Sequence, residues 1–354
     1  MPSPRVALAM IVRDEQRSLG RALDSAMALF DEVVVVDTGS RDAAVTIALD
    51  HGARVCHVPW TDDFAAARNA ALGATHADFT AMIDADEWIE PRTVDPVREW
   101  AAQATPLTAG SFTIVSDAES EGHVLRTRAD IVRVLPRGCR FEGRIHEQAT
   151  GFAQLIPVTG LLVRHDGYRS AQLARKKGRN ERLLRALLVE TPDDPYRRFQ
   201  LGRERQIAGD PTEAATCYLA ALPHVDDTTP WGDELRSRLI FCLHRSGRTQ
   251  EAWELTTTLL RRSPSAEVLF AAGNFFLDLA VAMPARRHRF LSMARHAWQA
   301  CLDLGDPTDG RDYTPGCGSF LAAENLAALC RSQGEEAEYR QWTRRGQELR
   351  ARNP

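Results

Sequence analysis

The fold is indicated by the stretch Phe79-Thr80-Ala81-Met82-Ile83-Asp84-Ala85-Asp86-Glu87, in which an apolar run leads directly into three carboxylates. Residues 79–83 predict a strand buried on both faces of a sheet. Alternate residues of an extended segment point to one side, so Asp84 and Asp86 are expected to lie together. Two such carboxylates are costly without a cation between them, and Mg²⁺ and Mn²⁺ prefer oxygen ligands. A solvated acidic turn could have the same sequence, so the choice between a metal site and such a turn depends on motifs elsewhere in the chain.

Strands alternate with helices through the first third of the chain. Apolar runs predict buried strands over Val6–Val12, 33–36, 54–58 and 79–83. Helices are predicted over 43–51 and Phe64–Ala74, and apolar residues recur at helical spacing from Leu19 to Phe30. This alternation is typical of a mostly parallel sheet.

The pattern changes after about residue 110. Short apolar segments predict strands over 111–115, 124–128, 131–135 and 161–165, with a polar, acidic turn between the first two. The later part of the sheet is therefore expected to be mixed or antiparallel.

From about residue 172 the chain is expected to be helical. Leu201-Gly202, Gly209-Asp210 and Glu213-Ala214 belong to one unit, and Gly247-Arg248 with Glu251-Ala252 match it 38 residues later. Weaker copies follow around 271–302 and 325–337. This period is typical of tetratricopeptide-like helical hairpins, and a generic α-bundle is the alternative. We expect an α/β domain over 1–171, a linker helix over 172–192 and a repeat domain over 193–354.

Composition excludes several classes of protein. A chain of 354 residues with 44% hydrophobic and 26% charged residues is long enough for two domains and is neither disordered nor collagen-like. The net charge of −4 argues against nucleic-acid binding. No run is long enough for a membrane span or has the pattern of a signal peptide, so a cytoplasmic location is expected. The seven cysteines form no CxxC pair, which argues against a zinc ribbon or a disulfide framework.

A further carboxylate, Asp37, follows the predicted strand 33–36 and precedes Thr38-Gly39-Ser40. Open α/β sheets bind ligands at the carboxyl ends of their strands, so Asp37 is a candidate to contact a base or ribose. Ser40 and Asp42 are interpreted as capping residues of the next helix. The sequence contains no GxGxxG after its first strand, no GxxxxGK[ST] and no GxSxG, which disfavours dinucleotide-binding dehydrogenases, P-loop NTPases and α/β-hydrolases.

Together these motifs resemble the inverting family 2 glycosyltransferases of the GT-A fold. The resemblance rests on Ala9-Met10-Ile11-Val12-Arg13-Asp14-Glu15, on 31–40, on Trp60-Thr61-Asp62-Asp63-Phe64 through Asn69, and on Ile83-Asp84-Ala85-Asp86-Glu87-Trp88. Residues 144–148, 165–168 and 177–180 are similar to the branch with a tetratricopeptide tail, which includes sublancin-type peptide S-glycosyltransferases. Asp14 and Arg41 depart from the family, which usually has Asn and Thr there. The resemblance implies a Rossmann-like α/β GT-A domain with a mostly parallel mixed sheet, followed by an all-α tetratricopeptide-like domain.

The resemblance also implies roles for individual residues. Glu15 and Asp37 would lie at the nucleoside, Asp84 at the ribose, and Arg68 and Arg144 at the nucleotide-sugar donor. Arg68 has a structural alternative, an ion pair with Asp62 or Asp63. Asp86 would bind the metal, and His146 or His165 could add a contact to it. Glu147 is the expected general base, although His146 and Glu147 could instead bond to each other or to Arg144.

These assignments predict metal-dependent transfer of a sugar, with inversion, from a UDP-sugar to a peptide or protein acceptor. The metal would be Mn²⁺ or Mg²⁺, and the helical repeats would offer a surface to the acceptor. One alternative is a cell-envelope glycan or a lipid-linked acceptor. Another is a non-catalytic repeat scaffold with a degenerate sugar-binding domain. A homodimer is compatible with the sequence.

Overall fold

The computed structural model describes residues 3–90, 95–120, 123–165, 178–307 and 314–352, of which 117–128 are described by their backbone alone. The chain divides into two compact units, Met1–Leu183 and Leu184–Pro354. The boundary expected at 171/172 lies outside the described residues. The helix α6 (Arg179–Glu190) runs through the observed division.

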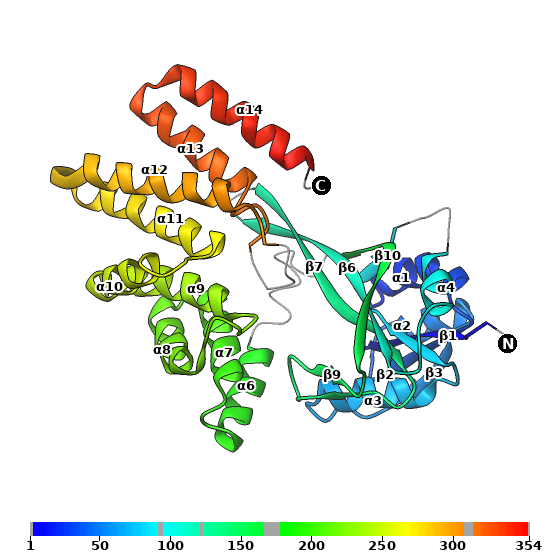
Figure 1. Ribbon diagram of the computed structural model, residues 1–354. Coiled ribbons are helices and arrows are strands. Elements are labelled where there is room, and N and C mark those ends of the chain that lie inside the picture. Colours follow the sequence, from blue (N-terminus) through cyan, green and yellow to red (C-terminus); the bar gives the residue numbers. More distant parts are fainter. Residues whose placement is uncertain (1–2, 91–94, 121–122, 166–177, 308–313, 353–354) are drawn as a thin grey trace. The chain divides into compact units, whose positions relative to one another are not determined.

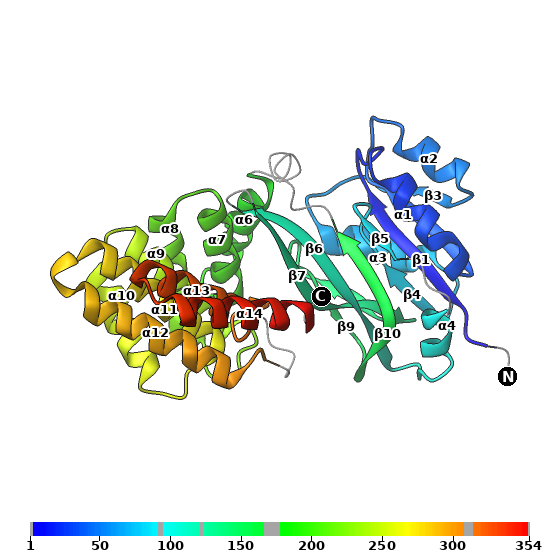
Figure 2. The same cartoon turned by 90° about the horizontal axis from the view of Figure 1, so that it is seen from above.

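The first unit contains an eight-stranded sheet with the order β3-β2-β1-β4-β7-β6-β10-β5 (Figure 2). Its parallel part consists of β1 (Val6–Val12), β2 (Glu32–Asp37), β3 (Arg54–His57) and β4 (Phe79–Met82). The remaining strands are β5 (Glu87–Ile89), β6 (Thr108–Ser120), β7 (His123–Pro136) and β10 (Gln154–His165). Because β7 is antiparallel to β4 and β6, and β5 to β10, the sheet is mixed, which confirms the expected fold class.

The later strands correct the sequence analysis. The strands expected over 124–128 and 131–135 are one continuous strand, β7, and β6 extends to Ser120, into the segment expected to be an acidic turn. The two strands pair from Ser111 opposite Val132 to Ser120 opposite His123. A long antiparallel ladder satisfies the backbone groups of both strands, so polar side chains do not end them. The sequence also missed β5 and the small sheet of β8 (Arg140–Glu142) and β9 (Gln148–Thr150).

Helices cover both faces of the parallel strands. Leu8 and Met10 of β1 pack in one cluster with residues of α1 (Leu19–Ala26), α2 (Ala44–Asp50) and α4 (Pro96–Ala101). Ala9 belongs to a second cluster, which contains Ala65 and Ala71 of α3 (Phe64–Ala74). Burial on both faces explains why these strands are continuous apolar runs. The helix α3 begins where the Asp63 side chain accepts a hydrogen bond from the Ala66 N–H at 2.8 Å.

The second unit is built from helical pairs (Figure 1). They are α7 (Pro195–Ile207) with α8 (Pro211–Ala221), α9 (Gly232–Arg245) with α10 (Thr249–Leu260), α11 (Ala266–Ala282) with α12 (Arg287–Leu304), and α13 (Phe320–Gln333) with α14 (Glu336–Arg352). The first two pairs turn at Gly209 and Gly247, whose φ angles of +83° and +82° favour glycine. This arrangement fits the expected tetratricopeptide-like repeats. Within the described residues, no helix has both the length and the hydropathy needed to cross a membrane.

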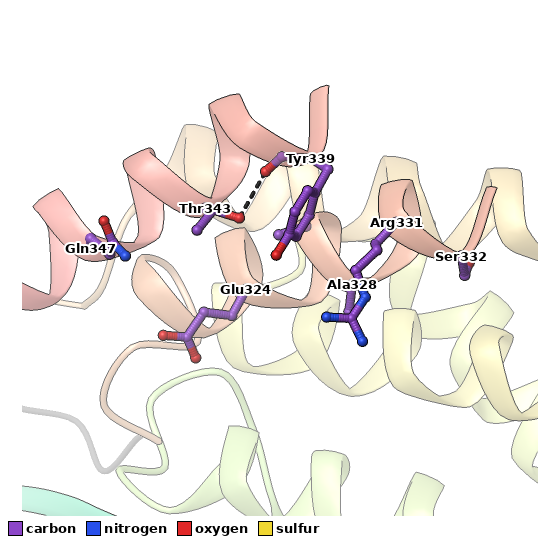
Figure 3. A pocket seen from close by; sticks show the side chains of 8 residues that line it. Glu324, Ala328, Arg331, Ser332, Tyr339, Thr343 and Gln347 are labelled. Atoms are coloured by element: carbon purple, nitrogen blue, oxygen red, sulfur yellow. Dashed lines mark hydrogen bonds between the residues drawn. The ribbon is translucent and has the colours of Figure 1, made fainter. Parts of the chain in front are cut away.

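The last helical pair has a cavity of about 560 Å³ between its helices (Figure 3). Glu324 and Arg331 of α13 and Tyr339 and Thr343 of α14 line it. The Thr343 hydroxyl donates to the backbone carbonyl of Tyr339 at 2.8 Å, so it remains within its own helix. Small side chains on α13, at Ala327 and Ala328, leave this space between the helices.

Candidate active site

Asp37 ends β2 and is 5% exposed. Its carboxylate accepts hydrogen bonds from the backbone N–H groups of Gly39 (3.2 Å) and Ser40 (3.0 Å) and lies 3.2 Å from Nδ1 of His57. Burial opposes ionisation, but these hydrogen bonds lower the pKa of Asp37 below its usual value. His57, which the sequence analysis missed, is opposite Asp37 in the β2–β3 ladder and is largely exposed. The turn after β2 thus presents an ionised carboxylate beside an imidazole.

The loop after β1 is joined to this turn. The Asp14 carboxylate accepts from the Arg41 N–H at 2.7 Å, and the Asp14 N–H donates to the Ser40 hydroxyl at 3.0 Å. The side-chain carbonyl of Asn, the usual residue of the family at this position, could accept the first bond equally well. Asp in place of Asn at residue 14 therefore preserves this contact. Glu15 follows in the same loop, and its Oε2 accepts from the Ser18 hydroxyl at 3.0 Å.

Arg68 of α3 is 8% exposed and binds two carboxylates. Its Nη2 donates to Asp84 Oδ1 at 2.8 Å, and its Nε donates to Oε1 of Glu147. Asp63 instead caps α3, and Asp62 accepts from Trp60 Nε1 at 2.9 Å. The alternative ion pair between Arg68 and these aspartates is therefore not formed. The Nη1 atom of Arg68 is buried and has no hydrogen-bond acceptor among the described residues.

Arg133 of β7 continues this chain of charges and was missed by the sequence analysis. It is 6% exposed, and its Nη2 lies 2.6 Å from Glu87 Oε1 and 3.4 Å from Asp84 Oδ2. The Asp84 N–H also donates to Glu87 Oε2 at 2.9 Å. Burial raises the pKa of Glu87 to about 6. For Asp84 burial acts in the same direction, but the Arg68 and Arg133 guanidinium groups hold its pKa well below the usual range.

Asp86 lies beside a histidine. It is 6% exposed, and its Oδ2 is 3.5 Å from Nε2 of His165 at the end of β10. The other ring nitrogen of His165 lies 3.1 Å from the Ser116 hydroxyl of β6. Burial disfavours the imidazolium, but the hydrogen bond with Asp86 and the nearby carboxylates raise the pKa of His165. The ladders of β10 with β5 and β6 bring these strand ends together.

This pair fits a divalent cation. A carboxylate oxygen and an imidazole nitrogen are metal ligands, and a hydroxyl on the second ring nitrogen orients the imidazole. A cation would take the place of the proton between Asp86 and His165.

His146 is not assembled with this pair. Among the described residues, Asp86, His146 and His165 do not form a group with ligand atoms within 4.8 Å of one another. His146 has a φ of +53° in the loop between β8 and β9. Arg144 of that loop has an exposed side chain, and its carbonyl accepts from the Phe64 N–H at 2.8 Å. The same loop contains Glu147, and this bond joins the loop to the start of α3.

Comparison with known proteins identifies the first unit. Residues 8–159 match the model of glycosyl transferase family 2. A TPR repeat-containing protein of Synechococcus elongatus is 34% identical over 56% of this chain and 51% of its own length. The glycosyltransferase SunS of Bacillus subtilis, of prophage origin, is 25% identical over 61% of this chain and 53% of its own. Among solved structures, glucosyl-3-phosphoglycerate synthase of Mycobacterium tuberculosis is 21% identical over 31% of this chain and 44% of that chain, with a TM-score of 0.26.

Residues 8–159 form a glycosyl transferase family 2 domain, as the motifs indicated. The chain spans about half the length of the curated relatives described above. The mixed sheet is that of the GT-A fold, and a helical region with the features of tetratricopeptide repeats follows it.

Proposed function

We propose that this chain transfers a sugar, with inversion, from a UDP-sugar to a side chain of a peptide or protein acceptor, and that it depends on Mn²⁺ or Mg²⁺. One observation carries the proposal: Asp84 and Asp86 follow β4 but have different partners. Two arginines neutralise Asp84, whereas Asp86 faces His165. The family 2 domain over residues 8–159 supports the donor chemistry.

The nucleoside would bind at the ends of β1 and β2. Asp37 keeps an ionised carboxylate there, and a carboxylate can accept hydrogen bonds from a base N–H or a ribose hydroxyl. His57 offers a largely exposed imidazole beside it. Glu15, in the loop joined to this turn, would border the nucleoside, and Asp84 would contact the ribose.

Asp86 and His165 would hold the divalent cation. When bound, the cation supplies positive charge where the departing diphosphate develops negative charge. Arg68 adds a second source of positive charge, because its buried Nη1 has an N–H without an acceptor among the described residues. We infer that an oxygen of the donor accepts this bond. The exposed side chain of Arg144 would assist from the neighbouring loop.

Glu147 would take the proton from the acceptor. Inversion requires a base on the side of the anomeric carbon opposite the leaving diphosphate. One oxygen of Glu147 is bonded to Arg68, and its Oε2 accepts no hydrogen bond from the described residues. Sharing Arg68 with a donor oxygen would weaken its contact with Glu147, so that the carboxylate could turn toward the acceptor.

The metal site gives the first test. The purified protein should hydrolyse a UDP-sugar slowly with Mn²⁺ or Mg²⁺, and EDTA should abolish this activity. Asp86→Asn should weaken Mn²⁺ binding, measured by electron paramagnetic resonance, by about 10–100-fold, as loss of a group at a metal site does. Asp24→Asn, an exposed change on α1, should leave both unchanged. Full activity in EDTA would contradict the metal requirement, and unchanged Mn²⁺ binding in Asp86→Asn would remove Asp86 from the site.

A further inference from the structure

The second unit contains a further cavity, for which the proposed donor chemistry gives no role. Its volume is about 280 Å³, and α7, α9, α11 and Thr314 line it. Ser237, Phe241 and His244 contribute from α9 at the spacing of one helix face. Residues from Glu267 to Asp278 contribute from α11, a distance of about 16 Å along the helix. The cavity is therefore elongated, and α9 and α11, which provide most of its lining, pack against each other (Figure 1).

One end of the cavity offers hydrogen-bond donors. Ser237 is 7% exposed, and its hydroxyl has no partner among the described residues. Gln206 also lines the cavity, and its Oε1 accepts from Arg238 Nη1 at 3.2 Å, which leaves its amide N–H groups to point elsewhere. Glu267 is at this end, but its oxygens already accept from the Thr314 N–H and hydroxyl. A buried hydroxyl without a partner costs free energy that a ligand oxygen would recover.

The other end is acidic and aromatic. Asp278 has a side chain that is 47% exposed, and the nearest basic group to it is His244 at 3.8 Å. Phe241, an exposed aromatic residue, and Phe275 provide apolar surface. Arg245 lies 5.5 Å from the Phe241 ring centroid but does not line the cavity. At the end near Ser237, by contrast, the lining residue Arg238 is already paired with Glu234 at 2.7 Å.

We propose that this cavity binds an extended segment of the acceptor polypeptide, with a lysine or arginine side chain at Asp278 and backbone carbonyl oxygens at Ser237 and Gln206. An extended chain covers about 16 Å with about five residues, which matches the two ends of the cavity. The methylene groups of a basic side chain suit the Phe241 and Phe275 surface, and its charge complements Asp278. The inference rests on the proposed peptide acceptor and names its class as basic.

The test measures binding of defined peptides to the full chain without any donor. The probes are acetyl-Lys-Ala-Ala-Ala-Ala-amide and the same peptide with Glu in place of Lys, observed by ligand-detected nuclear magnetic resonance. The Lys peptide should bind more tightly than the Glu peptide. Asp278→Asn should weaken its binding about fivefold. Asp303→Asn, an exposed change of equal charge on α12, should not. Equal binding of the two peptides, or equal effects of the two variants, would overturn the assignment.

Ser237→Ala distinguishes a ligand contact from a structural one. Because the hydroxyl has no partner among the described residues, its removal should leave the melting temperature unchanged or raise it. It should weaken binding of the Lys peptide about three- to tenfold, as loss of one hydrogen bond does. A lower melting temperature with unchanged peptide binding would overturn the role of Ser237.

Donor hydrolysis, measured separately, keeps the two proposals apart. A protein that hydrolyses the UDP-sugar but binds neither peptide would overturn only the cavity inference. One that binds the Lys peptide without any donor hydrolysis would overturn the sugar transfer and leave only a site for basic peptides in the cavity.

Discussion

At the scale of single residues, Arg68 connects two carboxylates with different proposed tasks. Asp84 would serve the donor and Glu147 the acceptor, yet both bind the same guanidinium group. A buried arginine between two carboxylates compensates their charge, and its loss would leave Glu147 uncompensated and Asp84 with Arg133 alone. Variants of Arg68 would therefore change donor binding, the position of Glu147 and folding together. Variants of the carboxylates are more informative.

Glu147→Gln should separate proton transfer from donor binding. The amide oxygen of glutamine can still accept from Arg68 but cannot take a proton. We expect the transfer rate to fall by about 10²–10⁴-fold, with the affinity for UDP nearly unchanged. Glu142→Gln, an exposed change on β8, is the matched control. If the acceptor is a thiol, whose pKa is about 8.5, the loss should shrink as pH rises. A Glu147→Gln enzyme with normal turnover would exclude Glu147 as the base.

Glu32 should make stability depend on acid pH. Burial opposes its ionisation, but hydrogen bonds from Arg54 and His76 lower the pKa of Glu32 to about 2. A depressed folded-state pKa stabilises the protein above the unfolded value of about 4.5, and this contribution is lost as pH falls toward 2. Glu32→Gln should thus lower the free energy of unfolding by about 1 kcal/mol at pH 7.

The pH series gives the decisive comparison for Glu32. The difference between wild type and Glu32→Gln, measured by urea denaturation, should close between pH 4.5 and 2. Glu99→Gln, an exposed change on α4, should show no difference at any pH. A difference for Glu32→Gln that persists unchanged to pH 2 would contradict the assigned shift.

The sequence predicted the acids of the site better than their neighbours. Asp37, Asp84 and Asp86 follow apolar runs, so a local pattern places them at strand ends. Arg133 and Ser116 belong to β7 and β6, and they reach the site only because those strands pair far along the sequence. The one local signal for Arg133 is a charge between Val132 and Val134 in a buried strand. Register decides which residues meet, and sequence alone does not give it.

At the scale of elements, the first strands could be predicted from the sequence because both of their faces are buried. Val6–Val12 and Phe64–Ala74 have the bounds that the pattern gave. The later strands were harder to predict, because the polar residues of a long antiparallel ladder give the same sequence pattern as a turn. The three-residue strand β5 is too short to give a period at all.

Helix pairing in the second unit depends on Gly202. A Cβ added there would lie 2.4 Å from the Tyr218 ring, which itself is fully buried. Gly202→Ala should therefore destabilise the unit by about 1–3 kcal/mol through overpacking. In Gly346→Ala the nearest atom would be 3.4 Å away, so ordinary contact and a better helix propensity should leave stability unchanged or raised. Thermal denaturation would compare the two, and a stable Gly202→Ala protein would contradict the packing argument.

At the scale of the whole molecule, the two units have separate cores. The buried clusters of the sheet unit end at Val163, and the cluster of the helical unit begins at Phe199. The proposed nucleotide contacts belong to the first unit and the peptide cavity to the second. Each unit should therefore keep its own binding property when the other is absent.

A fragment of residues 1–190 tests this division. It should bind UDP, measured by isothermal titration calorimetry, because Asp37, Arg68 and Asp84 all belong to the first unit. It should fail to glycosylate the native acceptor. The complementary fragment of residues 184–354 should bind no UDP. If the first fragment glycosylates the native acceptor as well as the full chain does, the repeats are not the acceptor platform.

The contact between Gly202 and Tyr218 also limits how the peptide cavity could be altered. With no side chain at residue 202, the Tyr218 ring packs against α7, and its hydroxyl donates to Gln206 Oε1 at 2.9 Å. The same oxygen accepts from Arg238. The buried Tyr218 therefore helps to orient two polar side chains of the cavity, those of Gln206 and Arg238. Redesign for a different peptide would have to retain this glycine and this tyrosine, although neither touches the ligand. Fewer residues of this protein can therefore be changed to alter its peptide specificity than the lining of the cavity alone suggests.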